Sequence, residues 1–244
     1  MLKGKKVLVT GGAGFIGSHI VDKLVDLEAE VVVLDNLITG KIENIENHII
    51  EDRVKFIQGD ITNETALERA LDGVEYVSHQ AALRSVPKSV DDPLNYYRVN
   101  VRGTMQLFLR ATDVDSKVKR IVFASSSSVY GDRVDFPESE TDVIRPLSPY
   151  ASSKAAGEDL AYVFTKIYGL DIVSLRYFNV FGPRQSLENQ YAVVVPKFIK
   201  CLLDGESPPI YGDGNQERDF TYVDDVVAIN LLALMMDDIA GEIF

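Results

Sequence analysis

Residues 5–17, KKVLVTGGAGFIG, join a run of branched apolar residues to three glycines spaced three apart, Gly11, Gly14 and Gly17. The apolar run predicts a buried strand, and the residues after Gly14 follow the period of a helix. Glycines at a strand–helix junction permit a tight turn and close packing of the helix on the strand. This stretch therefore predicts the first β-α unit of a parallel sheet.

The same alternation continues along the chain. Further strands are predicted at residues 30–35, 54–59, 75–80, 120–125 and 171–176, and helices at 14–27, 63–71, 93–112 and 150–168. Near-continuous apolar strands that alternate with helical patterns are typical of a sheet covered on both faces. The predicted fold class is α/β, a doubly wound parallel Rossmann sheet.

Composition limits the possible partners. The 244 residues carry a formal net charge of −12, which argues against binding to nucleic acid or to an anionic membrane surface. No apolar run approaches the roughly 20 residues that a membrane span needs. The single cysteine, Cys201, lies in a helical apolar pattern and is predicted to be a buried structural thiol. With no signal peptide before the first strand, we expect a cytoplasmic protein.

Acidic residues at two strand ends point to a dinucleotide. The glycine loop opens a helix whose N-terminus favours a phosphate group. Asp35 ends the second strand, where an acid accepts hydrogen bonds from adenosine ribose hydroxyls and repels a 2′-phosphate. Asp60 ends the third strand and is placed to reach the adenine, and Arg84 follows the fourth strand and is placed to pair with the pyrophosphate. The predicted cofactor is therefore NAD.

A serine, a tyrosine and a lysine supply acid–base chemistry. The fifth strand runs into SSSSVYG, so serine hydroxyls lie at its carboxyl end. The helix that follows carries Tyr150 in its first turn and Lys154 one turn later, on the same face. A tyrosine is a weak base at neutral pH, but a neighbouring ammonium and a cationic nicotinamide lower its pKa. Together these groups predict removal of a proton from an alcohol.

After Arg176 the alternation weakens. Residues 177–190 are predicted as a loop, 192–203 and 224–236 as helices, and 208–214 as a short strand and turn. We expect an NAD-binding domain over residues 1–180 and a smaller substrate-binding region over residues 181–244, with the helix at 224–237 packed back on the sheet. The last residues, AGEIF, predict the start of another strand, so we expect part of the substrate region to be missing from this chain.

Several motifs together give a resemblance to a known family. TGGAGFIG, Asp35, SSSSVYG, YASSK, RYFNVFGPRQ and YGDGNQERDFTYVDD resemble the extended short-chain dehydrogenase/reductases that act on nucleotide sugars. Within that group the chain is most similar to the UDP-hexose 4-epimerases, and HQAALRSVP suggests those that use N-acetylated sugars. The resemblance covers essentially the whole chain.

The resemblance implies a role for each matching position. Tyr150 would take the proton of the sugar 4-hydroxyl, Ser126 would bond the same hydroxyl, and Lys154 would hold the nicotinamide ribose. Cofactor contacts are implied for Gly11, Gly14, Phe15, Ile16, Gly17, Asp35, Asn36, Asp60, Ile61, Gln80, Ala81, Ala82, Arg84, Asn100, Ser125, Tyr150, Lys154 and Tyr177. Substrate contacts are implied for Ser85, Ser126, Tyr150, Asn179, Val195, Tyr211 and Arg218. No metal is implied, and His19, His48 and His79 are predicted to be structural.

Two serines separate related chemistries. Nucleotide-sugar 4,6-dehydratases of this group carry Thr-Asp-Glu directly before VYG, and UDP-glucuronate decarboxylases carry a glutamate at the last of these positions. Here the positions are Ser126, Ser127 and Ser128. Without carboxylates, elimination lacks an acid–base group, so we expect inversion at carbon 4 of UDP-glucose/UDP-galactose or of the N-acetylated pair. A UDP-glucuronate 4-epimerase, or another dehydratase or decarboxylase, remains the alternative.

A regulator that only binds NAD is the alternative outside enzymes. Such a protein would keep the glycine loop and Asp35 but would have no need of the Ser126, Tyr150 and Lys154 trio. The expected assembly is a homodimer, because the helices at 93–112 and 150–168 resemble the pair that forms an intersubunit four-helix bundle in this family. Their apolar positions are equally compatible with covering the sheet.

Overall fold

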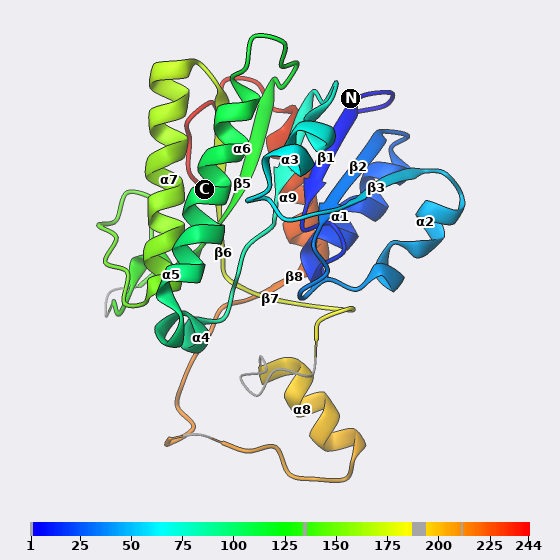
Figure 1. Cartoon of the computed structure of the whole chain (residues 1–244). Coiled ribbons are helices and arrows are strands. Elements are labelled where there is room, and N and C mark those ends of the chain that lie inside the picture. Colours follow the sequence, from blue (N-terminus) through cyan, green and yellow to red (C-terminus); the bar gives the residue numbers. More distant parts are fainter. Residues whose placement is uncertain (1, 134–135, 187–193, 211) are drawn as a thin grey trace.

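The computed structural model describes residues 2–133, 136–186, 194–210 and 212–244. At its centre is a parallel sheet of six strands in the order β3-β2-β1-β4-β5-β6 (Figure 1). The strands are β1 (Lys6–Thr10), β2 (Glu30–Asp35), β3 (Val54–Gln58), β4 (Tyr76–His79), β5 (Arg120–Ser126) and β6 (Asp171–Tyr177). The predicted doubly wound sheet is confirmed. Its strand order reverses between β1 and β4, the place where open sheets of this kind bind ligands.

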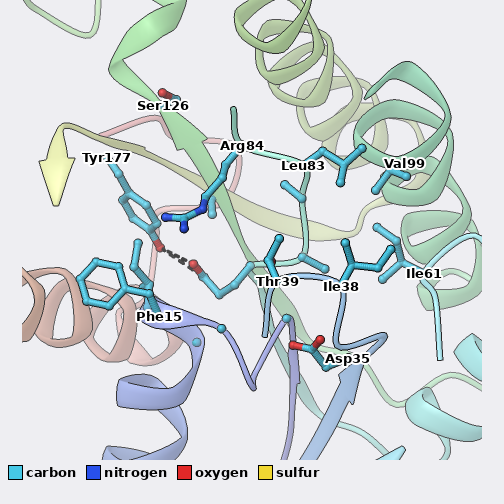
Figure 2. A pocket seen from close by; sticks show the side chains of 18 of the residues that line it. Phe15, Asp35, Ile38, Thr39, Ile61, Leu83, Arg84, Val99, Ser126 and Tyr177 are labelled. Atoms are coloured by element: carbon cyan, nitrogen blue, oxygen red, sulfur yellow. Dashed lines mark hydrogen bonds between the residues drawn. The ribbon is translucent and has the colours of Figure 1, made fainter. Parts of the chain in front are cut away.

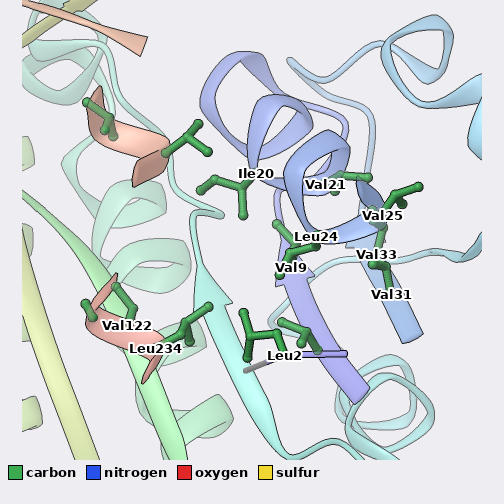
Figure 3. Packing of buried hydrophobic residues seen from close by; sticks show 14 of the residues in the cluster. Leu2, Val9, Ile20, Val21, Leu24, Val25, Val31, Val33, Val122 and Leu234 are labelled. Atoms are coloured by element: carbon green, nitrogen blue, oxygen red, sulfur yellow. The ribbon is translucent and has the colours of Figure 1, made fainter. Parts of the chain in front are cut away.

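Helices cover both faces of the sheet, which explains the near-continuous apolar strands. One face carries α1 (Phe15–Asp26), α2 (Glu46–Ile50) and α9 (Val223–Met235). The other face carries α3 (Glu64–Leu71), α6 (Thr104–Ala111) and α7 (Pro149–Tyr168). Figure 3 shows the first of these cores, in which apolar side chains of α1 pack over β1 and β2 and Leu234 of α9 lies nearby. Because α9 closes the same core as α1, residues from the end of the chain stabilise its beginning.

The predicted helix at 93–112 is divided in the structure. It consists of α5 (Pro93–Tyr96), a π-helical segment (Tyr97–Gly103) and α6, and it follows a short helix, α4 (Val86–Asp91). Prolines stand near the start of both α4 and α5, and the Asp92 side chain accepts from the Asn95 N–H at 3.3 Å. Helical periodicity therefore located this region but not its widened turn, a feature often found at functional sites.

The region after Tyr177 differs from the prediction in two places. Residues Asn179–Phe181 form β7, which pairs in parallel with β8 (Phe220–Tyr222), whereas a loop was predicted at 177–190. No strand occupies the described residues of the predicted segment 208–214. Strands of three residues carry little local signal, and this pairing joins segments about 40 residues apart.

Helix α8 (Val194–Leu203) stands apart from the sheet (Figure 1). Pro196 is its one buried residue. Cys201 is consequently half-buried and not buried as predicted. The prediction had the helix right but assumed a core against which its apolar side would pack.

The last residues extend the sheet beyond β6. Ile243 forms a parallel bridge with Ser174, and the Phe244 N–H donates to the Ser174 carbonyl at 3.0 Å. The predicted start of a strand at AGEIF is thus confirmed. Among the helices of the described ranges, none has the length and apolar character needed to cross a bilayer.

Candidate active site

A cavity of about 370 Å³ lies at the carboxyl ends of the central strands (Figure 2). Its wall is formed by the loop between β1 and α1, the end of β2, the loop after β4, the end of β5, the first turns of α7 and residues 177–180. The cavity therefore brings together segments from most of the chain at the topological switch point of the sheet.

The first loop presents an open helix end to the cavity. Gly14 precedes α1 without a side-chain cap, and the predicted cofactor residues Gly11, Gly14, Phe15, Ile16 and Gly17 all line the cavity. A Cβ atom on Gly17 would lie 2.2 Å from the Gly11 carbonyl oxygen, so a larger residue has no room there. Uncapped N–H groups at a helix N-terminus fit a pyrophosphate.

Asp35 lies buried at the end of β2 and also lines the cavity. Its carboxylate accepts hydrogen bonds from the Ala13 N–H at 3.0 Å and the Leu37 N–H at 2.8 Å. Burial raises the pKa of Asp35 above its ordinary value, and these two hydrogen bonds oppose the rise. Held in this way, the carboxylate suits the ribose hydroxyls of an adenosine.

Asn36 and Ile61 line the same end of the cavity, whereas Asp60 is not among the lining residues. The Asn36 amide donates to Asp60 Oδ2 at 2.8 Å, and the Thr62 N–H and hydroxyl donate to Oδ1. Burial alone would raise the pKa of Asp60, but these hydrogen bonds and Arg98 hold it below its ordinary value. Asp60 thus orients Asn36 from behind the wall.

The loop after β4 supplies four of the predicted cofactor residues, Gln80, Ala81, Ala82 and Arg84, to the cavity wall. The Gln80 amide is hydrogen-bonded to the Tyr177 hydroxyl, which donates to Gln80 Oε1 at 3.2 Å (Figure 2). The Asn230 amide of α9 donates to the same hydroxyl at 2.7 Å. Burial raises the pKa of Tyr177 to about 12, so this tyrosine stays neutral and shapes the wall.

Asn100 does not line the cavity but ties two parts of its wall together. Its side chain exchanges hydrogen bonds with the backbone N–H and carbonyl of Leu83, at 2.8 and 2.9 Å. The same amide donates to Ser153 Oγ at 2.9 Å, and Ser153 donates to the Tyr150 carbonyl at 2.7 Å. The π-helical segment therefore links the loop after β4 to the first turn of α7.

Ser126, Tyr150 and Lys154 meet at the end of β5, where all three line the cavity together with Ser125. Ser148 caps α7 by accepting from the Ala151 N–H at 3.1 Å, which places Tyr150 in the first turn. The Lys154 ammonium donates to the Ala124 carbonyl at 2.7 Å. This is the arrangement that the sequence predicts.

Burial dominates the acidity of the Tyr150 hydroxyl. It raises the pKa of Tyr150, whereas a hydrogen bond with Ser126 and the positive charge of Arg84 lower it. Burial also lowers the pKa of Lys154 to about 8, and Glu158 acts in the opposite direction. In the protein alone the pKa of Tyr150 is thus raised, and the expected lowering refers to the site with its cationic cofactor.

The predicted substrate residues are only partly brought together. Asn179 lines the cavity from β7, with its amide donating to the Asp219 carbonyl at 3.1 Å. Ser85 caps α4, Val195 lies on the separate helix α8, and Arg218 is exposed and donates to the Glu217 carbonyl; none of these three lines the cavity. Tyr211 lies outside the described residues.

A second group of residues lines the cavity and was not predicted from the sequence. After Asp35 the chain folds over the cavity through Ile38, Thr39 and Lys41, and the Asn44 amide donates to the Ala13 carbonyl at 2.8 Å. The sequence contained a signal for these residues, because the loop after β2 starts at the same edge of the sheet as the glycine loop after β1. Arg98 and Arg184 also line the cavity. Arg184 pairs with Asp22 of α1 at 2.8 Å, a contact with no local sequence signal.

The three histidines have separate partners. His19 bonds the Phe15 carbonyl, His48 pairs with Asp22, and His79 lies between Thr10 and Thr104. In the described part of the chain, no three residues of metal-ligating type are grouped.

Comparison with known proteins adds the family. The sequence profile of the NAD dependent epimerase/dehydratase family matches residues 7–244. A solved UDP-N-acetylglucosamine 4-epimerase of Methanobrevibacter ruminantium M1, in complex with UDP-N-acetylmuramic acid, superimposes with a TM-score of 0.93 at 46% identity. The match covers 99% of this chain and 76% of that one.

Two curated relatives carry out different reactions on nucleotide sugars, as their names state. The UDP-glucose 4-epimerase of Mycolicibacterium smegmatis is 40% identical over 91% of this chain and 71% of its own length. UDP-glucuronic acid decarboxylase 1 of Xenopus tropicalis is 35% identical over 98% of this chain, which spans 55% of that protein. The cradle of Gly11 and Gly17, the uncapped α1 and the buried Asp35 fit the dinucleotide that the profile names. The chain is therefore an enzyme of the NAD-dependent epimerase/dehydratase family, an extended short-chain dehydrogenase/reductase whose cofactor is NAD.

Proposed function

We propose that the enzyme inverts the configuration at carbon 4 of a UDP-hexose, either UDP-glucose/UDP-galactose or the N-acetylated pair, through a transient 4-keto sugar. The observation that carries this proposal is the chemistry of the cavity wall. Among its described lining residues, Asp35 is the one carboxylate, and it stands at the adenosine end. Around Tyr150 the wall offers hydroxyls and cations, so elimination and decarboxylation lack an acid–base carboxylate there.

Each residue has a task in the reaction. Tyr150 takes the proton from the sugar 4-hydroxyl, which Ser126 holds by a hydrogen bond. Lys154 holds the nicotinamide ribose and supplies positive charge behind the phenolate, and Arg84 adds a second positive charge near it. When bound, NAD would supply a reversible hydride acceptor for carbon 4. Asn179 contributes an amide for the diphosphate. The keto sugar rotates in the site and exposes its other face before the proton and hydride return.

The neighbouring serines support the same conclusion. Ser127 and Ser128 form a 3-10 turn after β5, and Ser128 Oγ donates to Ser126 Oγ at 2.9 Å. The Ser128 hydroxyl therefore orients Ser126. A hydroxyl in this position has no means of acting as a general base on the next sugar carbon at neutral pH.

The first test is a product assay. Purified protein with NAD receives UDP-galactose, UDP-N-acetylgalactosamine or UDP-galacturonate, and proton NMR follows the coupling at carbon 4. Inversion of that carbon alone, in either of the first two sugars, supports the proposal. Inversion of UDP-galacturonate alone selects the uronic acid alternative, which Arg84 near Tyr150 favours as a partner for a carboxylate. A 4-keto-6-deoxy product or loss of carbon dioxide would overturn epimerisation.

Tyr150→Phe tests the mechanism. Without the phenol, turnover should fall by between about 100-fold and 10,000-fold, the usual contribution of a general acid–base group. NAD affinity, measured by calorimetry, should stay close to that of the wild type. Tyr168→Phe is the matched control, because Tyr168 is an exposed tyrosine at the other end of the same helix. Full turnover by Tyr150→Phe would contradict the proposed role.

A further inference from the structure

A buried ion pair lies directly behind Lys154. Glu158 follows Lys154 by one turn of α7, and its carboxylate accepts from Arg176 Nε at 2.9 Å and Arg176 Nη2 at 2.8 Å. Both side chains are only 4% exposed. Neither residue is among those that line the cavity. Buried charges are costly, and a pair at this position calls for an explanation beyond packing.

Glu158 continues the row of active-site residues along α7. Residues 150, 154 and 158 are four apart and share one helix face. Each of these side chains is hydrogen-bonded to one of the last three residues of β5: Lys154 donates to the Ala124 carbonyl, Glu158 accepts from the Ser125 hydroxyl, and Tyr150 is bonded to Ser126. Glu158 is therefore the third member of the row that joins α7 to the reacting end of the cavity.

Arg176 fixes the carboxylate in this place. Two donors of its planar guanidinium bind the two oxygens of Glu158 side by side, the strongest geometry for such a pair. The guanidinium also lies over the Tyr130 ring, 4.7 Å from its centre. Arginine does not release its proton in proteins, so the guanidinium keeps its charge at any working pH.

The surroundings of Lys154 leave Glu158 as its stabilising acid. Glu158, one turn further along α7, favours the charged form of Lys154, and His79 of β4 is neutral because burial lowers its pKa to about 3. Tyr177 of β6 is a neutral phenol with its pKa raised by burial. Two further groups, Arg84 and Tyr96, act on Tyr150.

We propose that Glu158 and Arg176 are a positioning pair that keeps Lys154 protonated and thereby makes the Tyr150 hydroxyl acidic enough to react. The inference rests on the proposed roles of Tyr150 and Lys154. Arg176 locks Glu158, Glu158 stabilises the ammonium, and the ammonium stabilises the phenolate. Burial of Lys154 without this anion would shift the side chain toward the neutral amine, which favours ionisation of the neighbouring phenol less.

The test measures the protonation of Lys154 in the protein without cofactor or substrate. Lysine labelled with ¹³C at Cε is followed by NMR as the pH rises, with Lys154→Met to assign the signal. In the wild type the midpoint should lie near 8. In Glu158→Gln, and in the double variant Glu158→Gln/Arg176→Met, it should fall by about one pH unit, a tenfold loss of proton affinity.

The double variant separates electrostatics from folding. Glu158→Gln alone leaves a buried, unpaired guanidinium and risks misfolding, whereas the double variant removes both charges and keeps the volume. A double variant that folds and keeps the wild-type midpoint would overturn the proposal. A control is Arg120→Met/Asp171→Asn, which removes the ion pair between β5 and β6, with Arg120 Nη2 and Asp171 Oδ2 2.6 Å apart. It should lower stability without moving the Lys154 midpoint, and an equal movement there would also overturn the proposal.

A kinetic arm distinguishes this inference from the proposed function. With NAD and the sugar that the wild type converts, the high-pH fall in kcat should move to lower pH in the double variant by the same amount as the Lys154 midpoint. If no UDP-sugar is inverted by the wild type, the proposed function fails, and the NMR titration still tests the pair. If the wild type inverts its sugar and the midpoint does not move, the positioning role alone is wrong.

Discussion

The imidazole of His79 lies fully buried in a chain of hydrogen bonds. The Thr104 hydroxyl donates to the Asn100 carbonyl at 2.6 Å, so it accepts from His79 Nε2 at 2.9 Å. Thr10 accepts from the Ala81 N–H, so its hydroxyl donates to Nδ1 at 2.7 Å. The neutral ring has both nitrogens satisfied. Burial, aided by the charge of Lys154, lowers the pKa of His79 to about 3.

This residue makes folding sensitive to mild acid. Between pH 6.5 and 3 the unfolded chain binds a proton at His79 that the folded chain refuses, so the free energy of unfolding falls as the pH falls. The expected loss from this group is about 1.4 kcal/mol for each pH unit once the pH is below 6. Urea unfolding at pH 7, 6 and 5, above the range of most carboxylates, measures it. His79→Asn should flatten the slope, and an unchanged slope would contradict the assignment.

The sequence predicted the position of some single residues but not the contacts of others. Gly17, Asp35, Tyr150 and Lys154 were identified because each stands at a fixed offset from a strand or helix end. Asn100 was expected to support the nicotinamide region, but its bonds to Leu83 and Ser153 depend on a π-helical turn without a local signal. The role of Asp60 behind Asn36 likewise depends on an approach between two strand ends.

At the scale of elements, the contact of α7 with β5 depends on a glycine inside the helix. A Cβ atom on Gly157 would lie 2.3 Å from the ring of Phe123. Phe123 is 1% exposed. The helix therefore approaches the strand closely enough for Lys154 to reach the Ala124 carbonyl.

Gly157→Ala tests this contact, because the contact decides whether the free energy of unfolding rises or falls. In an exposed helix the change would stabilise by about 1 kcal/mol. Here the clash of the added methyl group with Phe123 should outweigh the gain in helix propensity and lower the free energy of unfolding by about 1–3 kcal/mol. Urea denaturation measures the change, and Gly157→Ala/Phe123→Leu should recover part of the loss. Asp159→Ala, at an exposed position of the same helix, should stay within about 0.5 kcal/mol of the wild type. A more stable Gly157→Ala variant would show that α7 has room to shift.

Elements with a strong period were predicted well, and short ones were not. The six strands and the long helices follow from apolar runs and helical spacing that act within about 20 residues. β7 and β8 each have three residues, and the Asn179 N–H donates to the Asp219 carbonyl 40 residues away. Such strands exist because of their partner, which no local pattern encodes.

At the scale of the whole molecule, the outer side of α6 and α7 is apolar and exposed. Met105 and Leu109 of α6 and Tyr162, Val163 and Ile167 of α7 are each at least 37% exposed. Both helices lie side by side on one face of the sheet (Figure 1). Several exposed apolar side chains on two neighbouring helices are compatible with a partner surface.

The predicted homodimer would bury this surface in a four-helix bundle. Sedimentation equilibrium at micromolar concentration should give twice the chain mass. Leu109→Glu/Val163→Glu should give monomers with unchanged helix content, because two charges would face an apolar partner. Val114→Glu is the control, since Val114 is fully exposed after α6. A wild-type monomer at that concentration would contradict the dimer.

The sequence by itself determined the β-α order, the glycine loop with Asp35, and the Ser126, Tyr150 and Lys154 trio, because these depend on spacing along single elements and the turns that follow them. Only the tertiary structure decided which residues stand behind that trio. Glu158 and Arg176 are 18 residues apart on different elements, and Thr10, His79 and Thr104 come from three segments. Their hydrogen bonds exist because the sheet brings distant side chains into a dry interior, where each polar group must find a partner.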